Sequence, residues 1–165
     1  MPTPVLLLKN SMEAESESER RVRISFSTDT ISSLSRLSEN DLAIESDLFI
    51  YSDAAKNDVN SDAVKEVREY IKTINGFKSI TIVERKNNMG LAKSVVSGVS
   101  EIVNKYGKVI VLEDDLITAP QFLRYMNKNL ENYEKVEDVI SIHGYNYPIK
   151  NIEKHFFLKG ADCWG

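Results

Sequence analysis

The stretch that most constrains the fold is residues 109–115, where four apolar residues run directly into three acidic ones. Val109 to Leu112 are mostly β-branched and show no polar alternation, which is typical of a strand covered on both faces in a parallel sheet. Glu113, Asp114 and Asp115 then stand at the carboxyl end of this strand. Ligands bind at this edge of open α/β sheets, and clustered carboxylates repel one another unless a cation offsets the repulsion. The motif therefore indicates either a metal and phosphate site or a solvated acidic turn.

Strand and helix patterns alternate through the middle of the chain. Residues 48–51 and 80–83 form short apolar runs of strand type, and residues 109–112 form the next one. Amphipathic helical patterns separate these runs. Their apolar positions are Val64, Val67, Ile71 and Ile74, closed by Asn75-Gly76, and then Leu91, Val95, Val99, Ile102 and Tyr106, closed by Gly107. A spacing of about thirty residues between strands predicts βαβ units, and hence an α/β fold with a mostly parallel sheet and flanking helices.

The first forty residues carry weaker patterns. Val5 to Leu8 are apolar and predict either a short buried strand or an ordered leader. Residues 10–21 are rich in Ser, Glu and Arg and are expected to be irregular or disordered. Residues 22–26 alternate between apolar and polar and predict a strand, which could be the first of the sheet. Thr28 to Thr30 could cap a helix that carries Ile31, Leu34 and Leu37 on one side.

After the acidic residues, the pattern predicts one more helix and two more strands. Thr118 is expected to cap the helix, with Pro120 in its first turn. Residues 139–142 and 156–158 are the strand candidates, and residues 143–148 form a loop between them. The helix residues expected to face inward are Phe122, Met126, Leu130 and Tyr133.

Composition limits the class of protein. A chain of 165 residues with 42% hydrophobic content can bury a core and is expected to form one domain over residues 1–165. The 21 basic and 25 acidic residues give a net charge of -4 with no basic stripe, which argues against nucleic-acid binding. Its apolar runs are far shorter than a transmembrane segment. A single cysteine, Cys163, fits a reducing compartment, so a soluble, cytoplasmic protein is expected.

Two further positions are candidates for the same sheet edge. Asp53 follows the strand at 48–51, and its carboxylate could accept hydrogen bonds from a nucleotide base or ribose, although a turn or capping aspartate is the commoner case. Asn88 and Gly90 precede the helix that opens at Leu91, where free backbone N–H groups suit an anion. Lys93, in the first turn of that helix, could reach a phosphate or could simply be solvated.

The last third of the chain holds isolated candidates. His143 follows a predicted strand and could act as a base or a ligand, although a lone histidine there is more often structural. His155 has no partner that the sequence reveals. Asp162 and Trp164 could line a sugar site, and Cys163 is interpreted as a small buried side chain.

Several segments together resemble the GT-A glycosyltransferases, and most closely those of the N-acetylglucosaminyltransferase I type. The acidic triplet followed by Ala-Pro and an aromatic residue is more specific than either piece alone. The similarity spans roughly residues 22 to 165. The segments that carry it are residues 48–53, 109–116, 119–122, 156–160 and 164–165.

The resemblance implies a sugar transferase that uses a nucleotide-diphosphate sugar donor, an acceptor of unknown identity, and Mn²⁺ or Mg²⁺. Asp115 would be the metal ligand, Glu113 and Asp114 would contact the ribose and the donor sugar, and Asp53 would contact the base. The stretch around Asn88 would line the base pocket. The family's catalytic base would lie beyond Gly165, so no catalytic residue is assigned and the elements that bind the acceptor are expected to be missing.

Two other functions remain open. The first is a non-catalytic module that binds a nucleotide or a metal ion. The second is a phosphoacceptor domain of flavodoxin-like topology, which also uses acidic residues at strand ends. That class needs an acidic pair after its first strand, and neither Lys9-Asn10 nor Ser27-Thr28 supplies one.

Overall fold

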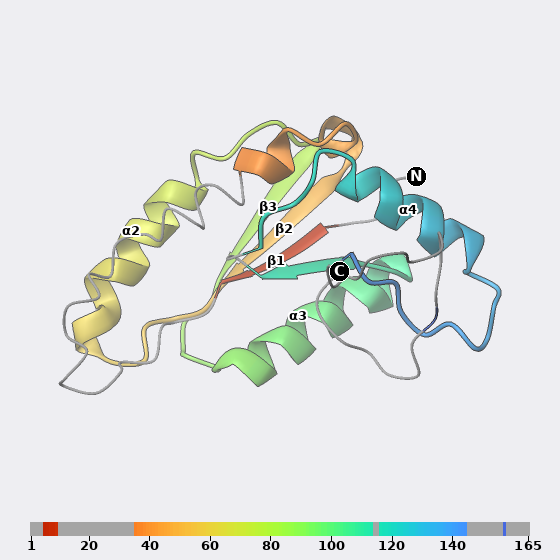
Figure 1. Cartoon of the computed structure of the whole chain (residues 1–165). Helices are drawn as coiled ribbons and strands as arrows, with labels where there is room; N and C mark the ends of the chain where they lie inside the picture. The colour runs from red at the N-terminus through yellow and green to blue at the C-terminus, as the bar shows by residue number, and fades with distance from the viewer. Residues whose placement is uncertain (1–4, 10–34, 114–115, 145–156, 158–165) are drawn as a thin grey trace, which may run out of the picture.

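The computed structural model describes residues 5–9, 35–113, 116–144 and 157. In this part of the chain, four parallel strands form one sheet in the order β3-β2-β1-β4. Their bounds are β1 Val5–Lys9, β2 Asp47–Ser52, β3 Ser79–Glu84 and β4 Ile110–Glu113. The predicted α/β class with a parallel sheet is therefore confirmed (Figure 1).

One of the two inner strands of the sheet, β1, is formed by residues 5–9. Leu7 of β1 lies opposite Ile50 on one side and Leu112 on the other. Of the two structures predicted for Val5 to Leu8, the strand is confirmed. The predicted strand at 22–26, the irregular segment at 10–21 and the start of the helix after Thr28 lie outside the described residues, although residues 35–38 are helical.

Helices cover both faces of the sheet (Figure 1). α2 (Ser61–Ile71) and α4 (Phe122–Asn132) pack on one face, and α3 (Leu91–Tyr106) packs on the other. The crossover from β2 to β3 and the crossover from β3 to β4 run in opposite directions across the sheet, so one preferred handedness places their helices on opposite faces. Short 3-10 turns, η2 (Ala43–Glu45) and η3 (Asp58–Asn60), precede β2 and α2.

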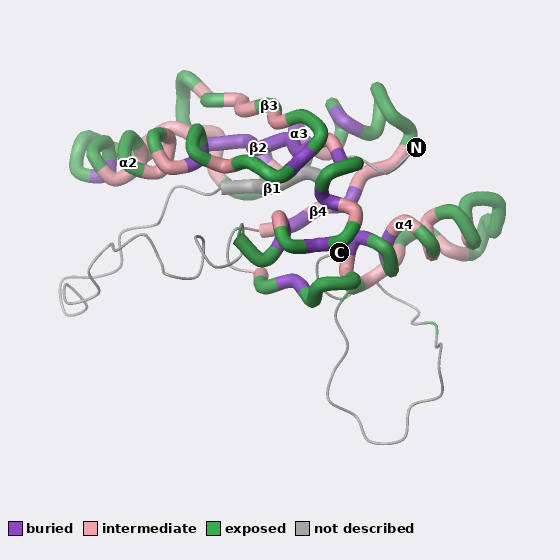
Figure 2. The backbone as a smooth tube through the Cα atoms, turned by 90° about the horizontal axis from the view of Figure 1, so that it is seen from above, coloured by how far each residue is buried: buried purple, intermediate pink, exposed green. Residues whose placement is uncertain are grey.

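The larger core lies under α2 and α4. Leu48 and Ile50 of β2 are fully buried there, which fits a strand that is covered on both faces. Figure 2 shows β2 as a mostly buried segment between the helices. The other buried members of this core are Leu37, Ala43, Ile71, Phe77, Ile110, Leu112, Leu123 and Met126.

The smaller core lies between the sheet and α3. Phe49 and Tyr51 point to this face because side chains alternate along a strand. They meet Ile102 of α3, while Ser94 and Gly98 are the other buried positions of that helix. Small residues at these positions let α3 pack closely against the sheet.

The predicted helix ends are partly confirmed. α3 begins at Leu91 and ends at Tyr106, and Gly107 closes it with a φ of +82°. α2 stops at Ile71 rather than Ile74, although Ile74 still packs against the larger core. The turn that follows contains Gly76 with a φ of +90°.

The predicted cap of α4 is wrong. Its N-cap residue is Gln121, which makes no side-chain capping bond. Instead, the backbone N–H of Leu123 donates to Oδ1 of Asn40 at 3.0 Å. The Thr118 hydroxyl lies three residues before the N-cap and accepts from Nδ2 of Asn40 at 3.3 Å. The cap is supplied by a residue distant in sequence, so no local pattern could reveal it.

The predicted strand at 139–142 is also wrong. These residues form no ladder with any described strand, and Ile140 is 88% exposed. Ile142 packs against the larger core. Short apolar runs with alternation satisfy the strand pattern even where no neighbouring strand is available to pair with them. Of the candidate at 156–158, Phe157 is described, and it is exposed and not in a strand.

Candidate nucleotide- and metal-binding edge

The carboxyl ends of the strands bring several predicted site residues to one edge of the sheet. β2 ends at Ser52, directly before Asp53, and β4 ends at Glu113. β1 lies between them, with Lys9 opposite Ser52 and Leu8 opposite Glu113. Because neighbouring strands are about 4.8 Å apart, the ends of β2 and β4 are separated by roughly 10 Å. Asp53 and Glu113 thus share an edge without being neighbours.

The strand order reverses between β1 and β4. From β1 the chain proceeds outward through β2 to β3, and then returns across the sheet to place β4 on the other side of β1. In open α/β sheets, ligands bind in the crevice at such a reversal, outside the carboxyl ends of the strands. The strand that carries Glu113 borders this position. Asp114 and Asp115, which follow it, lie outside the described residues.

Asp53 is buried and its carboxylate is bonded to the backbone. Only 3% of the residue is exposed. Oδ1 accepts from the N–H of Ala54 at 2.9 Å and of Met89 at 3.0 Å, while Oδ2 accepts from Gly90 at 2.9 Å. These bonds connect the end of β2 to the turn before α3. The observed contacts are therefore those of a turn or capping aspartate. The predicted contact with a base stays a prediction.

Asn88 lies beside Asp53 and adds to the same connection. Its Nδ2 donates to the carbonyl of Ala54 at 2.7 Å. The segment after β2 therefore accepts hydrogen bonds from the turn before α3 through both a side chain and a backbone carbonyl. Gly90 has a φ of +73°, a conformation that glycine adopts at little cost. Thus Asp53 and Asn88 are brought together through backbone contacts.

Arg68 of α2 is a residue at this edge that the sequence analysis missed. Its guanidinium donates to the carbonyls of Ser52, Asp53 and Arg85, at 3.4, 3.3 and 2.8 Å. It also pairs with Glu84 at 3.5 Å. This one side chain joins the carboxyl ends of β2 and β3. Because its acceptors are mostly carbonyls, no side-chain pattern in the sequence marks it.

A second polar group lies under α3, next to the edge. Tyr51 is fully buried, and its hydroxyl has no hydrogen-bond partner among the described residues. Burial, and then the nearby Glu101 carboxylate, raise the pKa of this phenol well above its usual range. The Arg85 guanidinium lies over the Tyr51 ring at 5.0 Å and donates to the Ser97 hydroxyl at 3.1 Å. These contacts hold α3 against the ends of β2 and β3.

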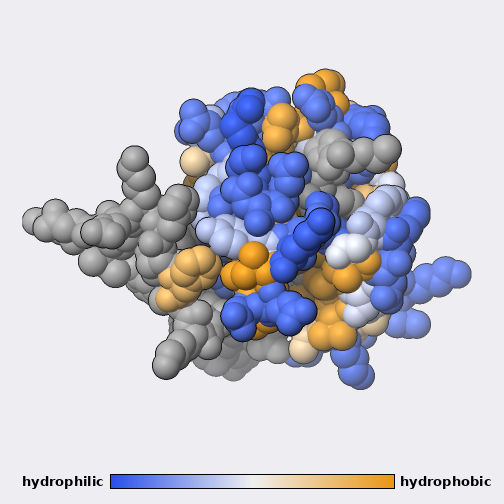
Figure 3. All heavy atoms as spheres, turned by 90° about the vertical axis from the view of Figure 1, so that its right-hand side faces the viewer, coloured by the Kyte–Doolittle hydropathy of each residue, from blue (hydrophilic) through white to orange (hydrophobic). Residues whose placement is uncertain are grey.

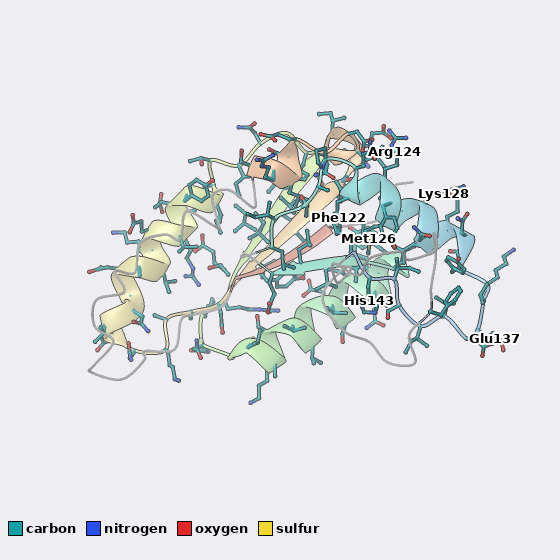
Figure 4. All side chains as sticks on the ribbon, viewed as in Figure 1. Phe122, Arg124, Met126, Lys128, Glu137 and His143 are labelled. Atoms are coloured by element: carbon teal, nitrogen blue, oxygen red, sulfur yellow. The ribbon has the colours of Figure 1, made fainter. Side chains whose placement is uncertain are left out.

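The described contacts of Lys93 and His143 are with residues outside the acidic triplet. Lys93 lines an open depression of about 440 Å³ on the surface of α3, with Met89, Ala92, Val96, Ser97 and Ser100. His143 Nε2 lies 2.9 Å from the Ser141 hydroxyl, and its carbonyl accepts from the Tyr125 hydroxyl. His143 therefore contacts its own loop and α4 (Figure 4). The other predicted positions, His155, Asp162, Cys163 and Trp164, lie outside the described residues.

The chemistry of the acidic triplet suits a hard cation. Carboxylate oxygens are ligands that Mg²⁺ prefers, with substrate phosphates completing the coordination shell. Among the described residues no group of three His, Cys, Asp or Glu side chains could hold a metal ion. Of the triplet, Glu113 alone belongs to this part of the chain. The other two carboxylates of the triplet directly follow Glu113 in the chain, and their oxygen atoms are of the type that the expected metal prefers.

Within the described part of the chain, no helix combines the length and apolar character needed to cross a membrane. Figure 3 shows one face of the molecule, where small apolar patches interrupt a largely hydrophilic surface. Comparison of the chain with protein-family models, with curated proteins and with solved structures found no match.

Proposed function

We propose that this chain binds a nucleotide-diphosphate sugar together with Mn²⁺ or Mg²⁺ and serves as the donor-binding part of a glycosyltransferase with a GT-A fold. The observation that carries the proposal is the position of β4. This strand leads into the acidic triplet and lies beside β1 where the strand order reverses. The carboxyl ends of strands at such a reversal border the crevice in which α/β proteins bind ligands.

Each acidic residue has a role in this proposal. Asp115 ligates the metal ion, and Glu113 and Asp114 contact the ribose and the donor sugar. A bound divalent ion would neutralise the charge that develops on the leaving diphosphate. Transfer also requires an acceptor hydroxyl that loses its proton to a general base. No residue of this chain is assigned that role, so we propose donor binding alone.

The contacts that Asp53 makes support a role different from the predicted contact with a base. A carboxylate has about four acceptor positions, and backbone N–H groups of Ala54, Met89 and Gly90 already use most of them. We propose that Asp53 shapes the turn that borders the donor site. Contact between a base and this turn would then use the backbone of residues 86–90.

The proposal is tested by measuring thermal unfolding with UDP, GDP, CDP and ADP, each with Mn²⁺ and with a chelator. A ligand at one hundred times its dissociation constant stabilises a protein by about 2.7 kcal/mol, so specific binding gives a clear rise in melting temperature. We expect one nucleotide to raise the melting temperature in Mn²⁺ and to have little effect in chelator, because phosphate oxygens complete the metal shell.

Two variants locate the site. Asp115→Asn should abolish the Mn²⁺-dependent rise, because a neutral amide is a poor ligand for a hard cation. Asp138→Asn removes an exposed acidic residue in the segment after α4 and should behave as the parent protein does. If no nucleotide stabilises the protein, or if Asp115→Asn responds as the parent protein does, the proposed site is wrong.

A further inference from the structure

We infer that β3 is a docking edge at which a second copy of this chain pairs in antiparallel orientation, with Thr81 of the two copies facing each other across a two-fold axis. This contact needs neither a nucleotide nor a metal ion, so it is independent of the proposed function. Three features of β3 carry it: a free side, the absence of protecting residues, and a sequence that matches itself when it is reversed.

β3 has one paired side and one free side in the part of the chain that the structure describes. It pairs with β2 from Ser79 to Glu84 and is the last strand in the order β3-β2-β1-β4. Figure 2 shows β3 at the outer margin of the sheet, with no described element beyond it. Such an edge presents unpaired backbone groups, which are a template for pairing with another strand.

The backbone groups on the free side follow from one hydrogen bond. The N–H of Arg85 donates to the Ser52 carbonyl at 2.9 Å, so the backbone of Arg85 faces β2. Successive residues of a strand direct their backbone groups to opposite sides. The N–H and C=O groups of Ile80, Ile82 and Glu84 are therefore the ones that face away from β2.

β3 lacks the features that usually protect an edge strand. Residues 80–83 are all β-branched, and the strand contains no proline, glycine or lysine. Its register with β2 is continuous, without a bulge. Native proteins blunt free edges with charges, prolines and bulges. Their absence from β3 favours an edge that pairs with another strand.

An antiparallel copy of β3 fits this edge when Thr81 lies opposite Thr81. Ile80 of one copy then lies opposite Ile82 of the other, and side chains of opposite residues contact each other on one face of the sheet. Both isoleucines already pack against the larger core, so the apolar pair extends that core toward the second copy. Their outward-facing backbone groups would exchange N–H···O bonds, and the Thr81 residues would form the non-hydrogen-bonded pair at the axis.

The charges at the two ends of β3 select the same register. Lys78 would lie opposite Glu84 of the second copy, and the side chains of both residues are at least one third exposed. Moving the axis by one residue toward Glu84 would instead place this carboxylate opposite Ile80. The present partners of the two side chains, Asp47 and Arg68, lie 3.5 Å away, so the new pairs would join existing ones. Because exposed ion pairs contribute little affinity, they mainly fix the register.

Sedimentation velocity over a range of protein concentrations tests for this dimer. We expect the parent protein to show a monomer–dimer equilibrium. Thr81→Lys places like charges directly opposite each other at the axis and should raise the dimer dissociation constant roughly fivefold. Thr81→Val, at the same exposed position, keeps a β-branched side chain and should dimerise at least as well as the parent protein. Circular dichroism and the melting temperature check that both variants are folded.

Cysteine variants in a Cys163→Ser background test the register itself. Thr81→Cys should form a disulfide between two copies under mild oxidation, because the Cα atoms of a non-hydrogen-bonded antiparallel pair lie about 4.5 Å apart. Ser79→Cys is the matched control, at an exposed position on the same face of the same strand. In this register the two copies of residue 79 are offset by roughly 13 Å along the strand, which is too far for a disulfide. Electrophoresis without reductant measures the cross-linked fraction.

Each outcome decides the inference. A parent protein that stays monomeric up to its solubility limit overturns it, and so does a Thr81→Lys variant that is folded and dimerises as the parent protein does. Larger assemblies in place of dimers would also contradict it, because a two-fold contact uses the same edge on both copies and closes. Equal cross-linking of Thr81→Cys and Ser79→Cys would show that the copies do not meet in this register. The thermal screen with nucleotides tests the proposed function separately.

Discussion

At the scale of single residues, Asp53 could serve in either of two ways, as a contact for a ligand or as a cap for a turn. The sequence allows a ligand contact or a cap, because both need the same carboxylate. The positions of the Met89 and Gly90 N–H groups favour the cap, and those positions depend on a turn 36 residues away. The contacts of Arg68 also depend on residues distant in sequence, since its three carbonyl acceptors come from the ends of β2 and β3.

Asp53→Asn should lower the free energy of unfolding by about 1 to 3 kcal/mol, because an amide NH₂ replaces an acceptor that faces backbone N–H groups. Urea denaturation measures this effect. Asp58→Asn, at an exposed aspartate in η3, is the matched control and should change stability little. Unchanged stability in Asp53→Asn would show that the bonds from Met89 and Gly90 contribute nothing to the fold.

At the scale of elements, the carboxyl end of α3 and the start of α4 are specified differently. Gly107 ends α3 through its own backbone conformation, so a local pattern predicts the stop. The start of α4 depends on Asn40, which no window around Thr118 contains. On α4 itself, Phe122 and Met126 lie toward the sheet while Arg124 and Lys128 lie toward solvent, as its amphipathic pattern predicts (Figure 4).

Gly107→Ala should destabilise the protein by about 1 kcal/mol, because an L-residue in the left-handed region is strained. A Cβ at this position would meet nothing within 4 Å, so the cost comes from the backbone alone. Asn104→Ala, at an exposed position of the same helix, should be neutral or slightly stabilising. Equal urea midpoints for the two variants would contradict the role of Gly107 as the helix stop.

At the scale of the whole molecule, β1 joins the two halves of the sheet. It pairs with β2 on one side and with β4 on the other, although residues 10–109 lie between it and β4 in the sequence. The candidate edge therefore depends on β1, which holds the strand that precedes Asp53 and the strand that precedes the acidic triplet at a fixed spacing. A protein organised in this way should lose its site and its fold together.

Leu7→Pro should abolish cooperative unfolding or lower the unfolding free energy by roughly 3 kcal/mol or more, because proline removes a ladder bond from a central strand and leaves a carbonyl unpaired. Circular dichroism during heating measures this change. Leu7→Val keeps the backbone N–H and should retain a cooperative transition. A normal transition in Leu7→Pro would place β1 outside the essential sheet.

The sequence by itself determined the alternation of strands and helices, the parallel sheet, and the placement of Asp53 and Glu113 at one edge. These features follow from apolar periodicity and from the shared direction of parallel strands, which are local properties. Only the tertiary structure decided that residues 5–9 form an inner strand, that 139–142 form no strand, and that Asn40 caps α4. Each of these depends on a partner far away in the chain, and the pairing of distant backbone groups leaves no periodic signal near either residue.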